Sequence, residues 1–88
     1  MNVVFDIETD GLHFEATRVH CLCLSIDGGD VKRYINRRDS GSIKVRYDGY
    51  IEDALAVLAE ADLVVAHNGI DFDLYILEKL YDFHIDPL

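Results

Sequence analysis

The sequence predicts an α/β protein with a mixed sheet, in the order three antiparallel strands, a helix, a parallel strand and a second helix. Three observations support this fold class. The first 36 residues are rich in short apolar runs with turn signals between them, two later segments carry apolar residues at helical spacing, and a short apolar run lies between those segments. A helix that links two strands of one sheet implies a right-handed parallel crossover, which places the fourth strand beside the first.

The first three strands follow from apolar patterns with short links. The opening strand contains the apolar run of residues 3–7. Residues 19–26 are largely apolar on both faces, which is typical of an interior strand covered on both sides. An Asp-Gly-Gly-Asp turn follows, and residues 31–36 return as a third strand. Because this strand carries Lys32 and Arg33, we expect it at an exposed edge of the sheet.

The second half of the sequence supplies two helices and one strand. Residues 37–49 lack periodicity and are expected to form a solvated loop, although its four Lys and Arg residues leave a phosphate-facing role as an alternative. Residues 62–66 are a short apolar run that predicts a buried strand, and residues 72–82 predict the second helix. Residues 50–61 predict the first helix, with an apolar stripe made of Ile51, Leu55, Leu58 and Ala61.

Composition indicates one small globular domain. Of 88 residues, 50% are hydrophobic and only one is Pro, which argues against disorder. No apolar run approaches the roughly 20 residues that span a membrane, and no secretion signal is seen, so a cytoplasmic location is expected. Lys and Arg number 8 against 17 Asp and Glu, a formal charge of −9. That sign is wrong for direct phosphate binding, unless metal ions or a partner domain meet the phosphates.

Cys21 and Cys23 are the only cysteines, and they fall on one face of the second predicted strand. At that spacing their Cα atoms lie near the upper limit for a disulfide, and strand geometry opposes closure. Cys-x-Cys without a second pair is also poor zinc spacing. We therefore interpret both as packed small side chains.

Asp6 and Glu8 stand two residues apart in the opening strand, so both side chains leave the same face of the sheet, with Cα atoms roughly 6.5–7 Å apart. Two charges about 4 Å apart repel by roughly 4 kcal/mol at an effective dielectric constant near 20. A divalent cation would offset this repulsion most directly. The alternative is a strand end that surfaces into solvent, with Asp10 and Gly11 forming an ordinary turn.

A second acidic segment, residues 67–73, follows the predicted fourth strand. Ligand sites in such sheets gather at the carboxyl ends of the strands. Asp73 falls in the first turn of the second helix, where the helix dipole favours an anion, and Asp71 is a candidate N-cap. Helix capping alone would explain both residues, but their expected position beside Asp6 and Glu8 favours a shared metal site.

Two motifs carry a family resemblance. Phe-Asp-Ile-Glu-Thr-Asp-Gly-Leu at residues 5–12 resembles the first motif of the DEDD superfamily of 3′–5′ exonucleases, which have a ribonuclease H-like fold. His-Asn-Gly-Ile-Asp-Phe-Asp at residues 67–73 resembles the second motif, in which the metal-binding Asp directly follows an aromatic residue. With Val-His-Cys at residues 19–21 between them, the motifs look most like the N-terminal proofreading domain of phage family A DNA polymerases.

The resemblance implies a two-metal 3′–5′ exonuclease that releases nucleoside 5′-monophosphates from the 3′ end of single-stranded DNA, using two Mg²⁺ or Mn²⁺ ions. Hard, oxygen-binding cations suit carboxylates. By the same resemblance, the metal ligands and catalytic residues are Asp6, Glu8 and Asp73. The residues that contact the terminal nucleotide are Thr9, Leu12 and Asn68.

The family pattern also requires a fourth carboxylate on a later helix, four residues after a Tyr or His. No such helix is found in residues 1–88, and His67-x-x-x-Asp71 has the spacing only inside the second motif. His20 and His84 are expected to be packed or surface histidines. We therefore expect residues 1–88 to be the N-terminal part of one exonuclease domain, with a sheet incomplete at the C-terminus and little activity.

The expected partners are the rest of a DNA polymerase chain or another subunit that completes the sheet, with a homo-oligomer as the alternative. The expected setting is the cytoplasm of a bacterial or phage-infected cell. Two other functions stay open at this point: a non-catalytic acidic module that docks a polymerase or mimics DNA, and a DEDD exonuclease that acts on RNA.

Overall fold

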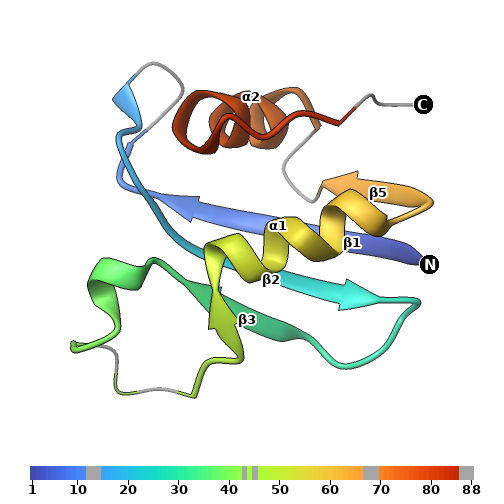
Figure 1. Cartoon of the computed structure of the whole chain (residues 1–88), viewed down its shortest axis with the longest axis horizontal. Coiled ribbons are helices and arrows are strands. Elements are labelled where there is room, and N and C mark those ends of the chain that lie inside the picture. Colours follow the sequence, from blue (N-terminus) through green and yellow to red (C-terminus); the bar gives the residue numbers. More distant parts are fainter. Residues whose placement is uncertain (12–14, 43, 45, 67–69, 86–88) are drawn as a thin grey trace.

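The computed structural model describes residues 1–11, 15–42, 44, 46–66 and 70–85 (Figure 1). Its elements are β1 (Asn2–Thr9), β2 (Val19–Ile26), β3 (Lys32–Ile35), the 3-10 turn η2 (Arg37–Asp39), β4 (Gly49–Tyr50), α1 (Ile51–Glu60), β5 (Leu63–Ala66) and α2 (Ile70–Tyr81). The five strands form one sheet in the order β4-β3-β2-β1-β5. The predicted mixed α/β fold is therefore confirmed.

The central prediction of the topology concerned the partners of β1. This strand pairs antiparallel with β2 and parallel with β5, with Asn2 opposite Leu63 and Phe5 opposite Ala66. The α1 helix makes the crossover between β3–β4 and β5, and α2 follows β5. The carboxyl ends of β1 and β5 thus lie side by side, as the sequence predicted.

Our placement of the third strand at the sheet edge was wrong. Part of the segment expected to be a loop forms η2 and β4, and β4 pairs in parallel with β3 at Tyr34 and Ile35. Asp48, just before β4, extends this edge, because its N–H donates to Arg33 O at 2.7 Å and its Oδ2 accepts the Arg33 N–H at 2.9 Å. The sequence did not reveal β4 because a strand of two residues is too short to show the alternation of apolar and polar side chains.

The fourth predicted strand, β5, is not fully buried as expected. Leu63 and Val65 are 41% and 45% exposed, and β5 lies at the other edge of the sheet. Both helices contribute to one core cluster, together with Val3, Phe5 and Ile7 of β1. The alternate residues of β1 and β5 point to the opposite face, which no described helix covers.

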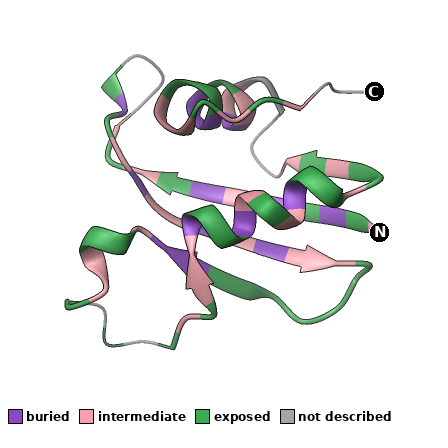
Figure 2. Ribbon diagram, viewed as in Figure 1, coloured by how far each residue is buried: buried purple, intermediate pink, exposed green. Residues whose placement is uncertain are grey.

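The apolar stripe of α1 also differs from the expected one. Ile51 and Leu58 are buried as predicted, but Ala54 rather than Leu55 is the third fully buried residue. In Figure 1, α1 runs in front of the strands. Figure 2 shows buried residues on both helices and on the strands in the middle of the sheet.

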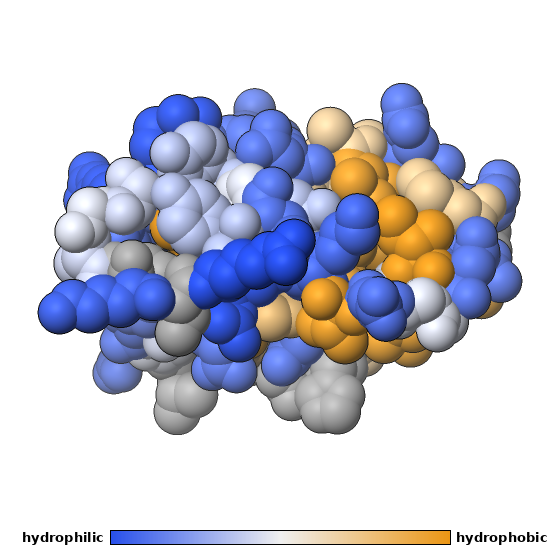
Figure 3. Space-filling view, turned by 90° about the horizontal axis from the view of Figure 1, so that it is seen from below, coloured by the Kyte–Doolittle hydropathy of each residue, from blue (hydrophilic) through white to orange (hydrophobic). Residues whose placement is uncertain are grey.

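The sheet has a helix-free side, which we call the open face. It is formed by Val4, Asp6 and Glu8 of β1 and by their cross-strand neighbours Ser25, Cys23 and Cys21 of β2. Val4 is 48% exposed there. A space-filling view from below the view of Figure 1 shows hydrophobic residues gathered mainly in the right half, with hydrophilic residues among them, and a mostly hydrophilic left half (Figure 3).

Candidate functional site

The first two predicted ligands lie together on the open face. Asp6 is opposite Cys23 and Glu8 is opposite Cys21, so strand alternation sends both carboxylates away from the helices. Asp6 is half-buried, whereas Glu8 is exposed. This pair is available to solvent and to a ligand that approaches the open face.

Asp73 has a very different environment. It is fully buried, and it is the one charged or polar residue among the buried residues that the structure describes. On α2 it precedes the buried Ile76 and Leu77 by three and four residues, so it belongs to the side of the helix that faces the core. Burial of a carboxylate is costly unless hydrogen bonds or an opposite charge compensate for it. An acidic residue at such a position is therefore a candidate for a functional role.

The three carboxylates come from elements that meet at one end of the sheet. Phe5 is opposite Ala66, the last residue of β5, so Asp6 lies just beyond the last parallel pair and α2 begins four residues after Ala66. Even so, the part of the chain that the structure describes contains no group of three or more His, Cys, Asp or Glu residues placed to hold a metal ion. Asp6 and Glu8 occupy the open face, while Asp73 lies in the helix layer.

The substrate-binding predictions are only partly within the described residues. Leu12 and Asn68 lie outside them. Thr9 is half-buried, and its hydroxyl donates to Gly11 O at 2.5 Å, so it shapes the turn after β1. The candidate N-cap Asp71 instead falls inside α2, which begins at Ile70. The roles assigned to Thr9, Leu12 and Asn68 stay predictions.

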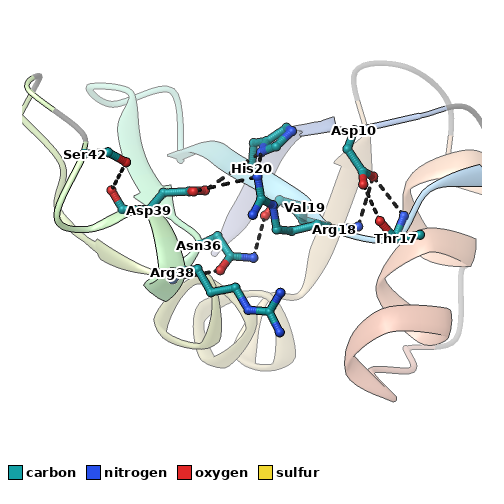
Figure 4. Close-up of polar contacts among 9 residues, drawn as sticks. All are labelled: Asp10, Thr17, Arg18, Val19, His20, Asn36, Arg38, Asp39 and Ser42. Carbon is teal, nitrogen blue, oxygen red and sulfur yellow. Dashed lines mark hydrogen bonds and ion pairs between the residues drawn. The ribbon is translucent and has the colours of Figure 1, made fainter.

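Asp10 has a structural role that the sequence did not reveal. Its carboxylate accepts the N–H of Thr17 at 2.8 Å, the Thr17 hydroxyl, and the N–H of Arg18 at 3.0 Å (Figure 4). These hydrogen bonds, led by the Thr17 hydroxyl, lower the pKa of Asp10 to about 2. Asp10 thus connects the end of β1 with Thr17 and Arg18, the two residues that lead into β2.

A polar cluster beside this connection was also missed. Arg18 Nη2 lies 3.3 Å from His20 Nδ1 and 3.8 Å from Asp39 Oδ1, and His20 Nδ1 lies 3.8 Å from Asp39 Oδ2 (Figure 4). The register of β1 and β2 shifts between Glu8 and Thr9, next to this cluster.

His20, predicted to be packed or on the surface, is half-buried. It lines a groove of about 590 Å³ together with Glu8 and Asp39.

The two cysteines are less tightly packed than the sequence predicted. Both are free and half-buried on the open face. Burial, followed by the neighbouring Cys23, raises the pKa of the Cys21 thiol to about 11. Because metal binding and nucleophilic attack require a thiolate, Cys21 is a poor candidate for either role near neutral pH.

Comparison with known proteins supports one family. A family model described as the RNase_H superfamily matches residues 3–87, nearly the full sequence. A search among curated proteins finds no match. Within the described residues, no helix is long and apolar enough to cross a membrane. The matched region includes both acidic segments and every strand and helix described above except the first residue of β1.

Proposed function

Because the chain belongs to the RNase H superfamily, we propose that it is a metal-dependent nuclease that removes nucleotides from the 3′ end of single-stranded DNA. Membership of the superfamily indicates a nuclease-type function. The finer assignment, to exonucleases that proofread for DNA polymerases, depends on the DEDD-like motifs around Asp6 and Asp73.

We assign Asp6, Glu8 and Asp73 as the metal ligands. Carboxylates are the donors that Mg²⁺ and Mn²⁺ prefer, so the residue types fit this role. Two such ions stabilise the attacking and leaving oxygens in phosphodiester hydrolysis. The described residues do not gather the three carboxylates into one cluster, and we therefore expect weak metal binding by residues 1–88 alone.

One observation supports this proposal above the others. The parallel pairing of β1 with β5 brings the strand of Asp6 and Glu8 beside the strand that leads into the helix of Asp73. Helix capping would explain an acidic residue in the first turn of α2, and a strand end in solvent would explain an acidic pair on β1. Neither explains why an acidic pair that faces solvent and a buried carboxylate occur at the same end of the sheet. Terminal nucleotide contacts by Thr9, Leu12 and Asn68 are part of the same proposal.

Cleavage of labelled single-stranded DNA in the presence of Mn²⁺ or Mg²⁺ tests the function. We expect slow release of nucleoside monophosphates from the 3′ end, and loss of this release in Asp6→Asn. Glu60→Gln is the matched control, because it removes one negative charge from an exposed position at the end of α1. Cleavage that persists in Asp6→Asn, or that starts at the 5′ end, would contradict the proposal.

Calorimetric titration with Mn²⁺ tests the ligand assignment independently of cleavage. We expect Asp73→Asn to weaken binding by about tenfold or more, since even residues that only support a metal ligand change affinity by 10–100-fold. Asp71→Asn changes the same charge in the same turn of α2 and should leave the affinity nearly unchanged. Equal effects of the two substitutions would refute the choice of Asp73.

A non-catalytic acidic module is the second candidate function. The formal charge of −9 favours it, as does the absence of a three-residue metal cluster among the described residues. In this case Mn²⁺ would bind no better than to a surface of equal charge, and Asp6→Asn would not change the titration.

The remaining alternative is an exonuclease that acts on RNA. Comparison of the cleavage rates of matched DNA and RNA strands would distinguish it.

A further inference from the structure

A small polar cleft of about 190 Å³ lies between the residues that lead into β2, the turn η2 and the end of α2. We propose that this cleft binds a backbone phosphate of the single-stranded substrate; this rests on the proposed nuclease function. The residues that matter for the argument are Thr17, Arg18, Asn36, Arg38 and Tyr81, all of which line the cleft.

The charge of the cleft is opposite to that of the chain as a whole. The sequence has 17 acidic residues against 8 Lys and Arg, yet two arginines and no Asp or Glu line this cleft. Two carboxylates contact the lining residues without lining the cleft themselves: Asp10 accepts the Thr17 and Arg18 N–H groups at 2.8 and 3.0 Å, and Asp39 lies 3.8 Å from Arg18 Nη2. Both carboxylates contact Thr17 or Arg18, so Arg38 is the positive charge in the lining for which the described residues record no acidic contact, and it is expected to attract an anion.

Arg38 supplies an accessible guanidinium group. Its side chain is exposed, and within the described residues it makes no ion pair. Its backbone is held in place, because the Arg38 N–H donates to Asn36 Oδ1 at 3.0 Å and Asn36 Nδ2 donates to Val19 O at 3.0 Å. Figure 4 shows the guanidinium extending away from Asp39. Asn36 therefore shapes the wall of the cleft and leaves Arg38 free to contact a ligand.

Arg18 is the more rigid of the two arginines. Its N–H donates to Asp10, and its Nη2 contacts His20 and Asp39. Arg18 Nε is buried and has no hydrogen-bond partner in the described part of the structure. The Arg18 side chain as a whole is 35% exposed, so a phosphate in the cleft would meet the exposed part of Arg18 and not the buried Nε. Because Arg18 is already held in place, little side-chain freedom is lost when a phosphate binds.

The cleft lies close to the strand that carries the proposed catalytic carboxylates. Thr9 is opposite Val19, and Asp10 N–H donates to Arg18 O at 3.2 Å. Arg18 therefore lies next to the carboxyl end of β1, where Glu8 and Thr9 are the last two residues of the strand. Because α2 lines the cleft while Asp6 and Glu8 lie on the open face, a nucleic acid strand whose 3′ end is at the acidic pair would pass around this end of the sheet to place a preceding phosphate in the cleft. Phosphate contacts of this kind position a strand without reading its sequence.

The test compares two neighbouring arginines by fluorescence anisotropy with a labelled oligothymidylate in EDTA, where no cleavage occurs. Arg38→Gln and Arg37→Gln each remove one positive charge from η2, but only Arg38 lines the cleft. Arg37 instead lies 3.6 Å from Glu52 and 4.1 Å from the centre of the Tyr50 ring. We expect Arg38→Gln to weaken binding about tenfold, as for loss of a hydrogen bond to a charged group, and Arg37→Gln to change it little.

The salt dependence of oligothymidylate binding and the conservative variant Arg38→Lys provide two further tests. For a single strand, each phosphate contact contributes about −0.7 to the slope of log affinity against log salt, so Arg38→Gln should make this slope less negative by about 0.7. Arg38→Lys should keep the slope, because it keeps the charge. Equal losses in Arg38→Gln and Arg37→Gln, or no binding by the unmodified chain, would overturn the inference.

The same assays separate this inference from the proposed function. Asp6→Asn should leave metal-free binding unchanged or slightly tighter, and abolish cleavage. If Asp6→Asn still cleaves DNA while Arg38→Gln loses affinity selectively, the nuclease assignment fails and the phosphate cleft stands. If cleavage depends on Asp6 but Arg37→Gln and Arg38→Gln bind alike, the cleft fails and the nuclease assignment stands.

Discussion

Asp10 and Asp73 show how the surroundings of a carboxylate decide its role. Asp10 is exposed, but three hydrogen bonds from Thr17 and Arg18 stabilise its charged form. Asp73 is buried on the core side of α2, at the position of an apolar residue in an ordinary amphipathic helix. Asp10 therefore holds two strands together, while Asp73 is the better candidate for metal chemistry.

Asp10 gives a prediction for the dependence of stability on pH. Its pKa falls from an ordinary 3.8 to about 2 in the folded state, so the unfolded chain binds a proton more readily. The stabilisation from Asp10 is therefore complete above about pH 4 and is lost as the pH falls towards 2. Asp10→Asn should be less stable than the unmodified chain at neutral pH, and the difference should shrink through this window.

Urea unfolding at a series of pH values measures the effect. Asp30→Asn is a suitable control, because Asp30 is exposed in the turn between β2 and β3. A difference between Asp10→Asn and the unmodified chain that stays constant from neutral pH to pH 2 would show that the hydrogen bonds of Asp10 do not favour its charged form.

At the scale of elements, β4 shows how a short strand connects two parts of the fold. It pairs with the end of β3 and leads directly into α1, whose first turn is capped by Asp53 Oδ2 accepting the Tyr50 N–H at 2.8 Å. Gly49 makes this approach possible. A Cβ atom at Gly49 would lie 2.8 Å from Asp53 Oδ2 and 3.2 Å from Tyr34 Cδ1.

Gly49→Ala is therefore expected to destabilise the chain, because the added methyl group displaces the Asp53 carboxylate from its capping position. Loss of a cap costs roughly 0.5–2 kcal/mol, and we expect a decrease of that size in the free energy of unfolding. Gly41→Ala is the matched control, since a Cβ atom there meets no atom within 4 Å. Urea denaturation that finds equal stability for the two variants would contradict this account.

At the scale of the whole molecule, the core lies on one face of the sheet. Leu58 of α1 is 1% exposed and packs in one cluster with residues of β1, β2 and α2. The open face instead carries the acidic pair and exposed side chains such as Val4. In a chain of 88 residues a single apolar layer is thin, so each buried leucine accounts for a large share of the stability.

Leu58→Ala should consequently lower the free energy of unfolding by about 2–5 kcal/mol, through lost burial and the cavity that remains. Leu63→Ala removes the same atoms from β5 but at a position that is 41% exposed, and it should cost less than about 1 kcal/mol. Thermal unfolding followed by circular dichroism distinguishes the two. Similar effects would indicate that the open face is as well packed as the helix-covered face.

The sequence by itself determined the order of the elements other than η2 and β4, the parallel partnership of β1 and β5, and the two acidic segments. These features depend on local periodicity and on the crossover rule, which a single sequence carries. It also pointed to Asp73, because an aspartate directly after Phe72 matches a family motif.

Only the tertiary structure decided which faces are covered and which distant polar groups meet. The pairing of Asp10 with Thr17, the cleft between Arg18 and Arg38, and the exposure of Val65 depend on how the sheet twists and where the helices pack. An apolar run such as β5 looks the same in a sequence whether one face or both are buried. Long-range contacts of this kind leave no periodic signal, so they can be found only once the chain is folded.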